Sequence, residues 1–234
     1  MDKNTFAQSL ALLRKNGPQR KFAQTIDLII NLRNLDLKQA EQQVDVYVQL
    51  PKSRGRTNKV CAFVGAELAA QAKGVCDVVV LHDDFAQYAG NKKKIKQLAD
   101  SCDLFIAQMN IMPDVAKTFG RVLGPKGKMP NPKAGCVVPA NANLKNVVDR
   151  LRNIVRAAAK LQMSIKLAIG KEDQADADIL DNIMTVYEQV RRALPQEDEN
   201  LRSVLLKLTM GAPVRVGVGT EEGEGKANKA GEAQ

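Results

Sequence analysis

Residues 60–81 read VCAFVGAELAAQAKGVCDVVVL, and this stretch decides the fold class of the centre of the chain. Two apolar runs, at 60–64 and 75–81, enclose a helix-like segment at 66–72. A third apolar run lies at 103–107, and further helical patterns lie at 92–99 and 112–119. Continuous apolar strands separated by helices are typical of a parallel sheet covered on both faces. The centre of the chain therefore predicts an α/β domain.

Both flanks of this centre show a different pattern, in which apolar and polar residues alternate. The run 44–50 is the clearest example, with valines and a leucine at every second position. Similar alternation lies at 22–32, 163–169 and 204–208, with a short last strand at 214–216. Alternation predicts half-buried antiparallel strands, although the run 22–32 by itself is also compatible with a helix. Helices are predicted at 4–16, 144–155 and 179–194.

These patterns together predict two domains. An α+β domain with an antiparallel sheet is built from both chain termini, and an α/β domain with a parallel sheet is inserted into it. We place the outer domain at 1–64 and 160–219 and the insertion at 65–159. The segment at 220–234, TEEGEGKANKAGEAQ, lacks the apolar residues that a core needs, so we expect a disordered tail.

The charge of the chain is positive and segregated. The 234 residues carry a net charge of +9. Ten basic residues between 117 and 160 accompany a single acidic residue, Asp149, whereas the stretch 172–199 is acidic. A concentrated positive charge indicates a polyanionic partner, although a solvated helix face explains part of the run 145–160. The acidic stretch is interpreted as a solvent face directed away from that partner.

Other features of the chain bear on its location. No apolar run approaches the roughly 20 residues that cross a bilayer, and the first residues lack the apolar segment of a signal peptide. We therefore expect a cytoplasmic protein with no membrane partner. Cys61, Cys76, Cys102 and Cys136 are scattered without a C-x-x-C pair. This spacing favours reduced, buried thiols over a zinc site or a disulfide framework.

The densest motif is GRVLGPKGKMPNPKAG, at residues 120–135. Its glycines and prolines predict a rigid loop, neither helix nor central strand, that presents Lys126, Lys128 and Lys133. A Walker A phosphate loop would need Gly in place of Val122 and Ser or Thr in place of Met129, so the nucleotide interpretation fails. The alternative interpretation is a long surface loop.

Two smaller motifs follow predicted strands. In Thr209-Met210-Gly211, the glycine would let an RNA backbone approach, the hydroxyl could meet a ribose 2′-OH, and the thioether could pack on a base. A plain strand-ending turn is the alternative. His82, the only histidine, has no second ligand or nucleophile beside it in the sequence, which favours a surface or capping role. No catalytic residue, metal ligand or cofactor is predicted.

At this point several motifs, taken in order, resemble one family. Lys21-Phe22, the segment VQLPKSRGR at 48–56, the loop motif at 120–135 and the run KLTMG at 207–211 closely resemble the L1 family of large-subunit ribosomal proteins. The resemblance extends from the first helix to about Val216, and the wording of the loop motif resembles the archaeal type. One departure is Ala212, which stands where many members place a proline.

The resemblance implies both a fold and a function. It implies an α+β domain formed from both termini and an inserted Rossmann-like domain. It also implies a non-enzymatic constituent of the large ribosomal subunit that binds large-subunit rRNA and forms the mobile stalk beside the exit site, where deacylated tRNA is released. Many members repress translation by binding their own mRNA. A protein of this kind is expected to be monomeric when free and to need no cofactor.

The resemblance also carries RNA-binding positions onto this chain. The main positions are Lys21, Phe22, Thr25, Lys52, Arg54, Lys166, Gly170, Lys171, Ser203, Thr209, Met210 and Gly211. Secondary RNA contacts are expected at Lys126, Lys128 and Lys133 of the insertion. Because sequence-independent charge does not select a site, we hypothesise that specificity resides mainly in the outer domain and electrostatic capture partly in the insertion.

Two other classes of protein compete with this interpretation. An α/β enzyme would need a phosphate-binding turn and a catalytic constellation, and a nucleotide would raise its thermal midpoint. A general RNA chaperone would bind unrelated RNAs nearly equally, whereas a ribosomal protein should strongly prefer one rRNA element.

Overall fold

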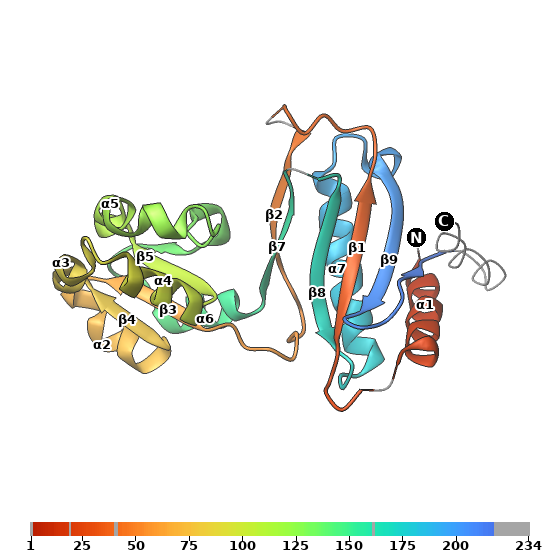
Figure 1. Cartoon of the computed structure of the whole chain (residues 1–234), viewed down its shortest axis with the longest axis horizontal. Coiled ribbons are helices and arrows are strands. Elements are labelled where there is room, and N and C mark those ends of the chain that lie inside the picture. The colour runs from red at the N-terminus through yellow and green to blue at the C-terminus, as the bar shows by residue number, and fades with distance from the viewer. Residues whose placement is uncertain (1, 19, 40–41, 161, 218–234) are drawn as a thin grey trace, which may run out of the picture. The chain divides into compact units, whose positions relative to one another are not determined.

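The computed structural model describes residues 2–18, 20–39, 42–160 and 162–217, and these residues form two compact units. The terminal unit contains Met1–Val44 and Ala158–Gln234, and the inserted unit contains Asp45–Ala157 (Figure 1). One unit holds an antiparallel sheet and the other a parallel sheet, which confirms the predicted fold class. The predicted disordered tail at 220–234 lies outside the described residues.

The terminal unit is built on a four-stranded antiparallel sheet in the order β10-β9-β1-β8. Its strands are β1 (Thr25–Leu32), β8 (Ser164–Lys171), β9 (Leu201–Leu208) and β10 (Val214–Arg215). In β1, every second residue from Ile26 to Leu32 is buried, and the residues between them are half-buried. This period of two is that of a sheet with one packed face, and each buried aliphatic side chain stabilises the fold by roughly 1.5–3 kcal/mol.

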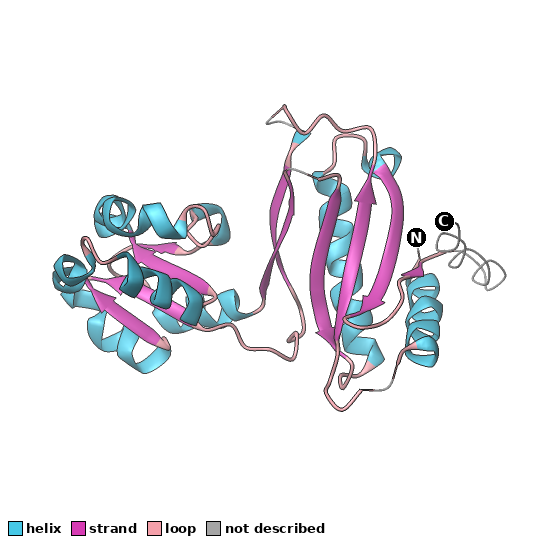
Figure 2. Cartoon of the chain, in the orientation of Figure 1, coloured by secondary structure: helices cyan, strands magenta, loops and turns pink. Residues whose placement is uncertain are grey.

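Two helices supply the other side of this core. Helix α1 (Lys3–Asn16) packs against β9 and α7, and helix α7 (Asp176–Ala193) packs against β8. The rings of Phe6 and Tyr187 meet edge-on, with centroids 5.6 Å apart. Figure 2 shows α7 behind the sheet, while no helix from the described residues of this unit covers the face toward the viewer. We call this side the open face, defined by the half-buried residues of β1 and their neighbours on the other strands.

The inserted unit contains a four-stranded parallel sheet in the order β4-β3-β5-β6. Its strands are β3 (Val60–Val64), β4 (Val78–Leu81), β5 (Leu104–Gln108) and β6 (Val137–Val138). Every residue of β3 is buried because helices cover both faces of the sheet. Consecutive residues of β3 point into different cores, Ala62 into the one with α2 (Ala66–Val75) and α6 (Leu144–Arg152), and Phe63 into the other.

Phe63 lies at the centre of the second core. This core is closed by α3 (Phe85–Tyr88), α4 (Lys92–Ser101) and α5 (Met112–Leu123). The ring of Phe63 stacks on Phe105 at a centroid distance of 5.7 Å and lies 4.7 Å from Phe119. Short 3₁₀ helices occur at η2 (His82–Asp84), η3 (Met109–Ile111), η4 (Pro132–Ala134) and, in the terminal unit, η5 (Glu197–Asn200).

The chain passes between the units through two strands. β2 (Val44–Gln49) and β7 (Ile154–Ala159) form a separate two-stranded sheet. Across this sheet, Arg156 donates from Nε to Oδ1 of Asp45 at 2.8 Å and from Nη2 to Oδ2 at 2.9 Å. The guanidinium carbon also lies 5.6 Å from the ring centroid of Tyr47. A bidentate ion pair and a cation–π contact therefore join the two strands.

The structure differs from the sequence predictions in three places. The inserted unit begins at Asp45 and not at 65, because β3 hydrogen-bonds to β4 and β5 and is a central strand of the parallel sheet. The helix predicted at 144–155 ends at Arg152, and Val155 belongs to β7. The loop motif at 120–135 also begins inside a helix, because α5 continues to Leu123 before Gly124 and Pro125 end it.

Candidate nucleic-acid interface

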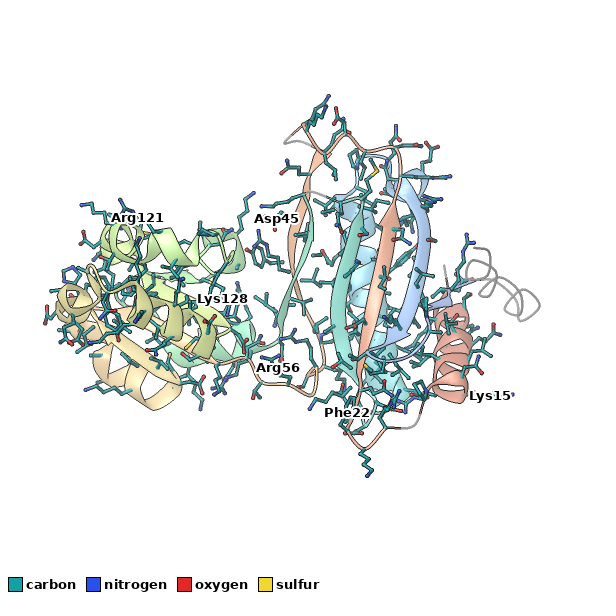
Figure 3. All side chains as sticks on the ribbon, in the orientation of Figure 1. Lys15, Phe22, Asp45, Arg56, Arg121 and Lys128 are labelled. Carbon is teal, nitrogen blue, oxygen red and sulfur yellow. The ribbon has the colours of Figure 1, made fainter. Side chains whose placement is uncertain are left out.

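One end of the open face brings together residues from three separate parts of the chain. The first residue of β1, Thr25, pairs with Lys171 at the end of β8. On the other side, Thr209, which follows β9, donates its backbone N–H to the Thr25 carbonyl at 3.1 Å. Met210 follows in the turn after β9, and its side chain is 57% exposed. Phe22, three residues before β1 and labelled in Figure 3, is 55% exposed.

A buried glutamine that we did not predict holds these segments in place. Gln24 is only 1% exposed. Its Oε1 accepts a hydrogen bond from the Met210 N–H at 3.2 Å, and its Nε2 donates to the Pro18 carbonyl at 2.8 Å. Its own carbonyl accepts from the N–H of Glu172 at 2.8 Å. The only sequence signal for this role is a polar residue at an inward position of the alternating run 22–32.

The hydroxyl of Thr209 is already engaged in part. Oγ1 donates to the Thr25 carbonyl and accepts from the Thr25 N–H, both at 3.2 Å. A hydroxyl has one proton and two acceptor lone pairs, so one lone pair stays available to a ligand. A ribose 2′-OH could therefore meet Thr209 as a donor but not as an acceptor.

At both glycines of the predicted set, Gly170 and Gly211, an added Cβ would lie close to neighbouring atoms. A Cβ on Gly170 would lie 2.6 Å from Oε1 of Gln174, and a Cβ on Gly211 would lie 3.2 Å from Cβ of Leu208. Gly170 also lies at a β-bulge, where the β1–β8 register shifts between Ile26 and Asp27. Bulges next to functional sites are common because they redirect side chains locally.

The other predicted positions of the terminal unit lie further along the open face. Lys166 pairs with Ile29, and Ser203 pairs with Asn31, whose Nδ2 donates to the Ser203 hydroxyl at 3.0 Å. At about 3.3 Å per residue, these positions lie roughly 13 and 20 Å along β1 from Thr25. The predicted residues are therefore spread over the length of the open face and do not form a single cluster.

The charge of the open face is mixed. Lys207 pairs with Asp27 across β9 and β1. Burial raises the pKa of the Asp27 carboxyl, and the positive charge of Lys207 partly offsets this shift. A polyanion that approached this face would meet the lysines and this one carboxylate of β1. The pKa of the Asp27 carboxyl is therefore expected to change when a polyanion binds to this face.

Two predicted residues belong to the inserted unit and not to the open face. Lys52 is exposed, in the loop after β2. Arg54 is half-buried, and its Nη2 donates to Oδ1 of Asn58, while burial lowers the pKa of its guanidinium. Arg54 thus contributes to the packing of its own loop.

The three lysines of the 120–135 motif have different environments. Lys133 is exposed on η4. Lys126 pairs with Asp100 of α4. The ammonium of Lys128, labelled in Figure 3, donates to the carbonyls of Ala99 and Cys102, both at 2.7 Å. Because helix carbonyls at a C-terminus lack intrahelical partners, Lys128 caps α4 and is not freely presented to a ligand.

The carboxyl edge of the parallel sheet is the place where an α/β enzyme would bind a nucleotide. Between β3 and β5, this edge is occupied by Gln108, which is 3% exposed. Its Oε1 accepts from the Gly65 N–H at 2.9 Å, and its Nε2 donates to the Glu67 carboxylate at 3.3 Å. An amide in contact with the α2 N-terminus and a carboxylate beside it both oppose phosphate binding there.

Other candidate sites of the sequence also have structural explanations. His82 is exposed, and its Nε2 lies 3.2 Å from Oδ2 of Asp114. The four cysteines are free thiols, three of them buried and Cys76 half-buried. Within the described ranges, no group of three or more His, Cys, Asp and Glu side chains could hold a metal ion. None of the helices in those ranges has the length and apolar character needed to cross a membrane.

These features define a protein with an open antiparallel sheet in one unit and a separate parallel α/β unit inserted into it. The family model described as "Ribosomal protein L1p/L10e family" matches residues 12–212. The chain is 37% identical to the large ribosomal subunit protein uL1 of Methanothermococcus thermolithotrophicus over 216 residues, which are 92% of this chain and 99% of that protein.

It is also 39% identical to the protein uL1 of Nanoarchaeum equitans over 206 residues, which are 86% of this chain and 95% of that protein. The chain therefore belongs to the ribosomal protein L1p/L10e family, and the resemblance seen in the motifs, including its archaeal type, is confirmed.

Proposed function

We propose that this protein is a cytoplasmic constituent of the large ribosomal subunit that binds large-subunit rRNA through the open face of its terminal unit. The observation that supports this proposal is the end of the face where Phe22 and Met210 lie exposed above a rigid hydrogen-bonded frame. Exposed apolar side chains on fixed backbone suit the recognition of RNA shape and of unstacked bases. No catalytic role is proposed.

The division of labour between the units follows from their charges. The hydrogen bonds that hold Thr209 and Met210 in place join neutral groups of Gln24, Thr25 and Thr209, so this part of the open face can discriminate between RNAs by shape. The exposed Lys133, with other basic residues of the inserted unit, can add salt-sensitive attraction to phosphates without choosing a site. The proposed specificity therefore resides mainly in the terminal unit.

The finer roles of the proposal concern movement and regulation. We propose that the bound protein forms a mobile stalk that assists the release of deacylated tRNA from the exit site, and that it represses its own mRNA by binding an rRNA-like leader. Two separately packed units, between which the chain passes in β2 and β7, are suited to a moving element. The free protein is proposed to be a monomer.

The test compares binding to a stalk-base fragment of large-subunit rRNA with binding to a scrambled hairpin of equal length. Met210→Asp is the test variant, and Met109→Asp is its control, because Met109 is 60% exposed but belongs to the inserted unit. If six to ten phosphates are contacted, both affinities should fall by roughly 10³–10⁵ between about 50 and 200 mM salt.

A preference for the native fragment that persists across this salt range, and that only Met210→Asp abolishes, supports the proposal. Equal binding to both RNAs would instead favour a general RNA chaperone. A nucleotide-dependent rise in thermal midpoint would favour the enzyme interpretation.

A further inference from the structure

A second feature of the open face lies at the end remote from Thr209. A hollow of about 550 Å³ opens there, within the roughly 300–1,000 Å³ range of ligand sites. Its lining residues come from the chain before β8, the end of β1, β9 and β10; they are Asn31, Leu32, Met163, Arg202, Ser203, Leu205 and Arg215. Only Ser203 of this set was among the predicted RNA-binding positions.

The lining of the hollow combines an apolar surface with a fixed polar pair. Met163 is 46% exposed although its side chain is apolar, and Leu205 is half-buried. The thioether of a methionine is polarizable and makes favourable contacts with aromatic rings. Beside it, the hydrogen bond from Asn31 to Ser203 fixes the positions of an amide and a hydroxyl, which can both hydrogen-bond to the polar edge of a ligand.

The charged groups of the hollow are all positive. Arg202 and Arg215 are both exposed, on the neighbouring strands β9 and β10. Neither guanidinium has an ion pair or a hydrogen bond with the described part of the chain. No acidic side chain is among the lining residues. Such uncompensated arginines can each bind a phosphate through two parallel hydrogen bonds.

A row of residues connects this hollow with the rest of the open face. Arg215 pairs with Leu205, Leu205 with Ile29, and Ile29 with Lys166. Two cations therefore flank two aliphatic side chains across the sheet. Since Asn31 lies roughly 20 Å along β1 from Thr25, one RNA segment of several nucleotides can reach from the hollow to Met210.

We propose that this hollow holds one unpaired nucleotide of the bound RNA, with its base against Met163 and Leu205 and its flanking phosphates on Arg202 and Arg215. The base must be unpaired because only an unstacked base offers its flat face to a side chain. The inference deepens the proposed function and rests on it, because it adds a second contact with the same RNA at the far end of the face.

The experiment measures the affinity of the full chain for the stalk-base rRNA fragment across salt. The test variant is Arg202→Gln combined with Arg215→Gln. Its control is Arg192→Gln, which removes one exposed arginine from α7, the helix on the other side of the sheet. A third variant, Met163→Ala, removes the apolar contact without changing charge. Thermal unfolding of each variant checks that the fold is retained.

The loss of two phosphate contacts should lower the salt slope of log affinity by about 1.5. The advantage of the native protein over the double variant should then shrink about eightfold between ~50 and ~200 mM salt. Met163→Ala should weaken binding several-fold at every salt concentration and leave the slope unchanged. Arg192→Gln should match the native protein.

Two failures are distinguishable. If the native protein prefers the rRNA fragment and the double variant keeps its slope and affinity, the hollow does not bind RNA and this inference is overturned. If the native protein shows no preference, the proposed rRNA specificity is overturned, while a lowered slope in the double variant would still support an RNA contact in the hollow.

Discussion

The Thr209 hydroxyl lies 3.2 Å from both the backbone nitrogen and the backbone oxygen of Thr25. It thereby adds a side-chain link to the backbone bond from the Thr209 N–H to the same carbonyl. This arrangement attaches the turn that contains Met210 to Thr25, the first residue of β1. Strand pairing and the candidate RNA contact thus depend on the same side chain.

The first prediction separates these two roles with Thr209→Val, in which a methyl group replaces the hydroxyl. The free energy of unfolding should fall by about 1 kcal/mol, because the partners are exposed and can bind water instead. Affinity for the rRNA fragment should fall about tenfold, as the acceptor for a ribose 2′-OH is lost. Denaturant unfolding and fluorescence anisotropy measure the two effects. Thr209→Ser keeps the hydroxyl and should bind normally; equal affinity for all three proteins would refute a direct role.

The second prediction concerns the lysines of the 120–135 motif. Lys128→Met removes the charged cap of α4 but keeps the aliphatic stem, so the inserted unit should lose about 1.5–3 kcal/mol of stability. The salt slope of RNA binding should not change. Lys133→Met, at an exposed lysine, should have the opposite profile, with unchanged stability and a slope lowered by about 1. A lowered slope in Lys128→Met would mean that this lysine leaves its carbonyl partners to bind RNA.

The third prediction concerns the sheet of β2 and β7. Arg156→Lys cannot reproduce the fork of two hydrogen bonds to Asp45, and it weakens the contact with Tyr47. We expect a loss of about 1 kcal/mol and faster amide exchange in the residues of β2 and β7. Arg121→Lys, at an exposed arginine of α5, is the matched control. Unchanged exchange in Arg156→Lys would show that backbone pairing alone holds these strands.

The sequence patterns predicted the two sheets because burial determines them. A strand covered on both faces must be apolar throughout, as β3 is, and a strand covered on one face must alternate, as β1 does. An alternating pattern does not show which strand it pairs with. The run at 44–50 was therefore assigned to the outer domain together with the other alternating strands. Val155 was assigned to a helix because it continues the helical spacing of Leu144, Val148 and Leu151, although the helix ends before Asn153.

The site was predicted less completely than the fold. The turn at Thr209-Met210-Gly211 was located by its motif, but the role of Gln24 depends on partners far away in the sequence. The sequence also does not show which lysines have partners within the fold. Lys128 and Lys133 therefore look equivalent in the sequence, although their environments differ in the structure. The arginines of the hollow, Arg202 and Arg215, were missed because they come together only through the pairing of β9 with β10, which the sequence pattern does not specify.

The last prediction concerns the Asp27 carboxyl, whose pKa is raised by burial. A raised folded-state pKa means that the folded protein binds this proton more tightly than the unfolded chain does. Stability should therefore fall as pH rises from the ordinary carboxyl value through the raised one, and Asp27→Asn should remove this part of the pH dependence. An approaching RNA adds negative charge, so it should raise the same pKa further and bind with proton uptake.

Asp27→Asn should accordingly bind the rRNA fragment more tightly than the native protein at neutral pH and show a weaker gain in affinity on acidification. Asp149→Asn, at an exposed carboxylate of α6, is the control and should show neither change. Anisotropy titrations at a series of pH values measure both effects. Weaker binding by Asp27→Asn would indicate instead that the carboxylate accepts a hydrogen bond from the RNA, for example from a cytosine amino group, because only then does its negative charge favour the complex.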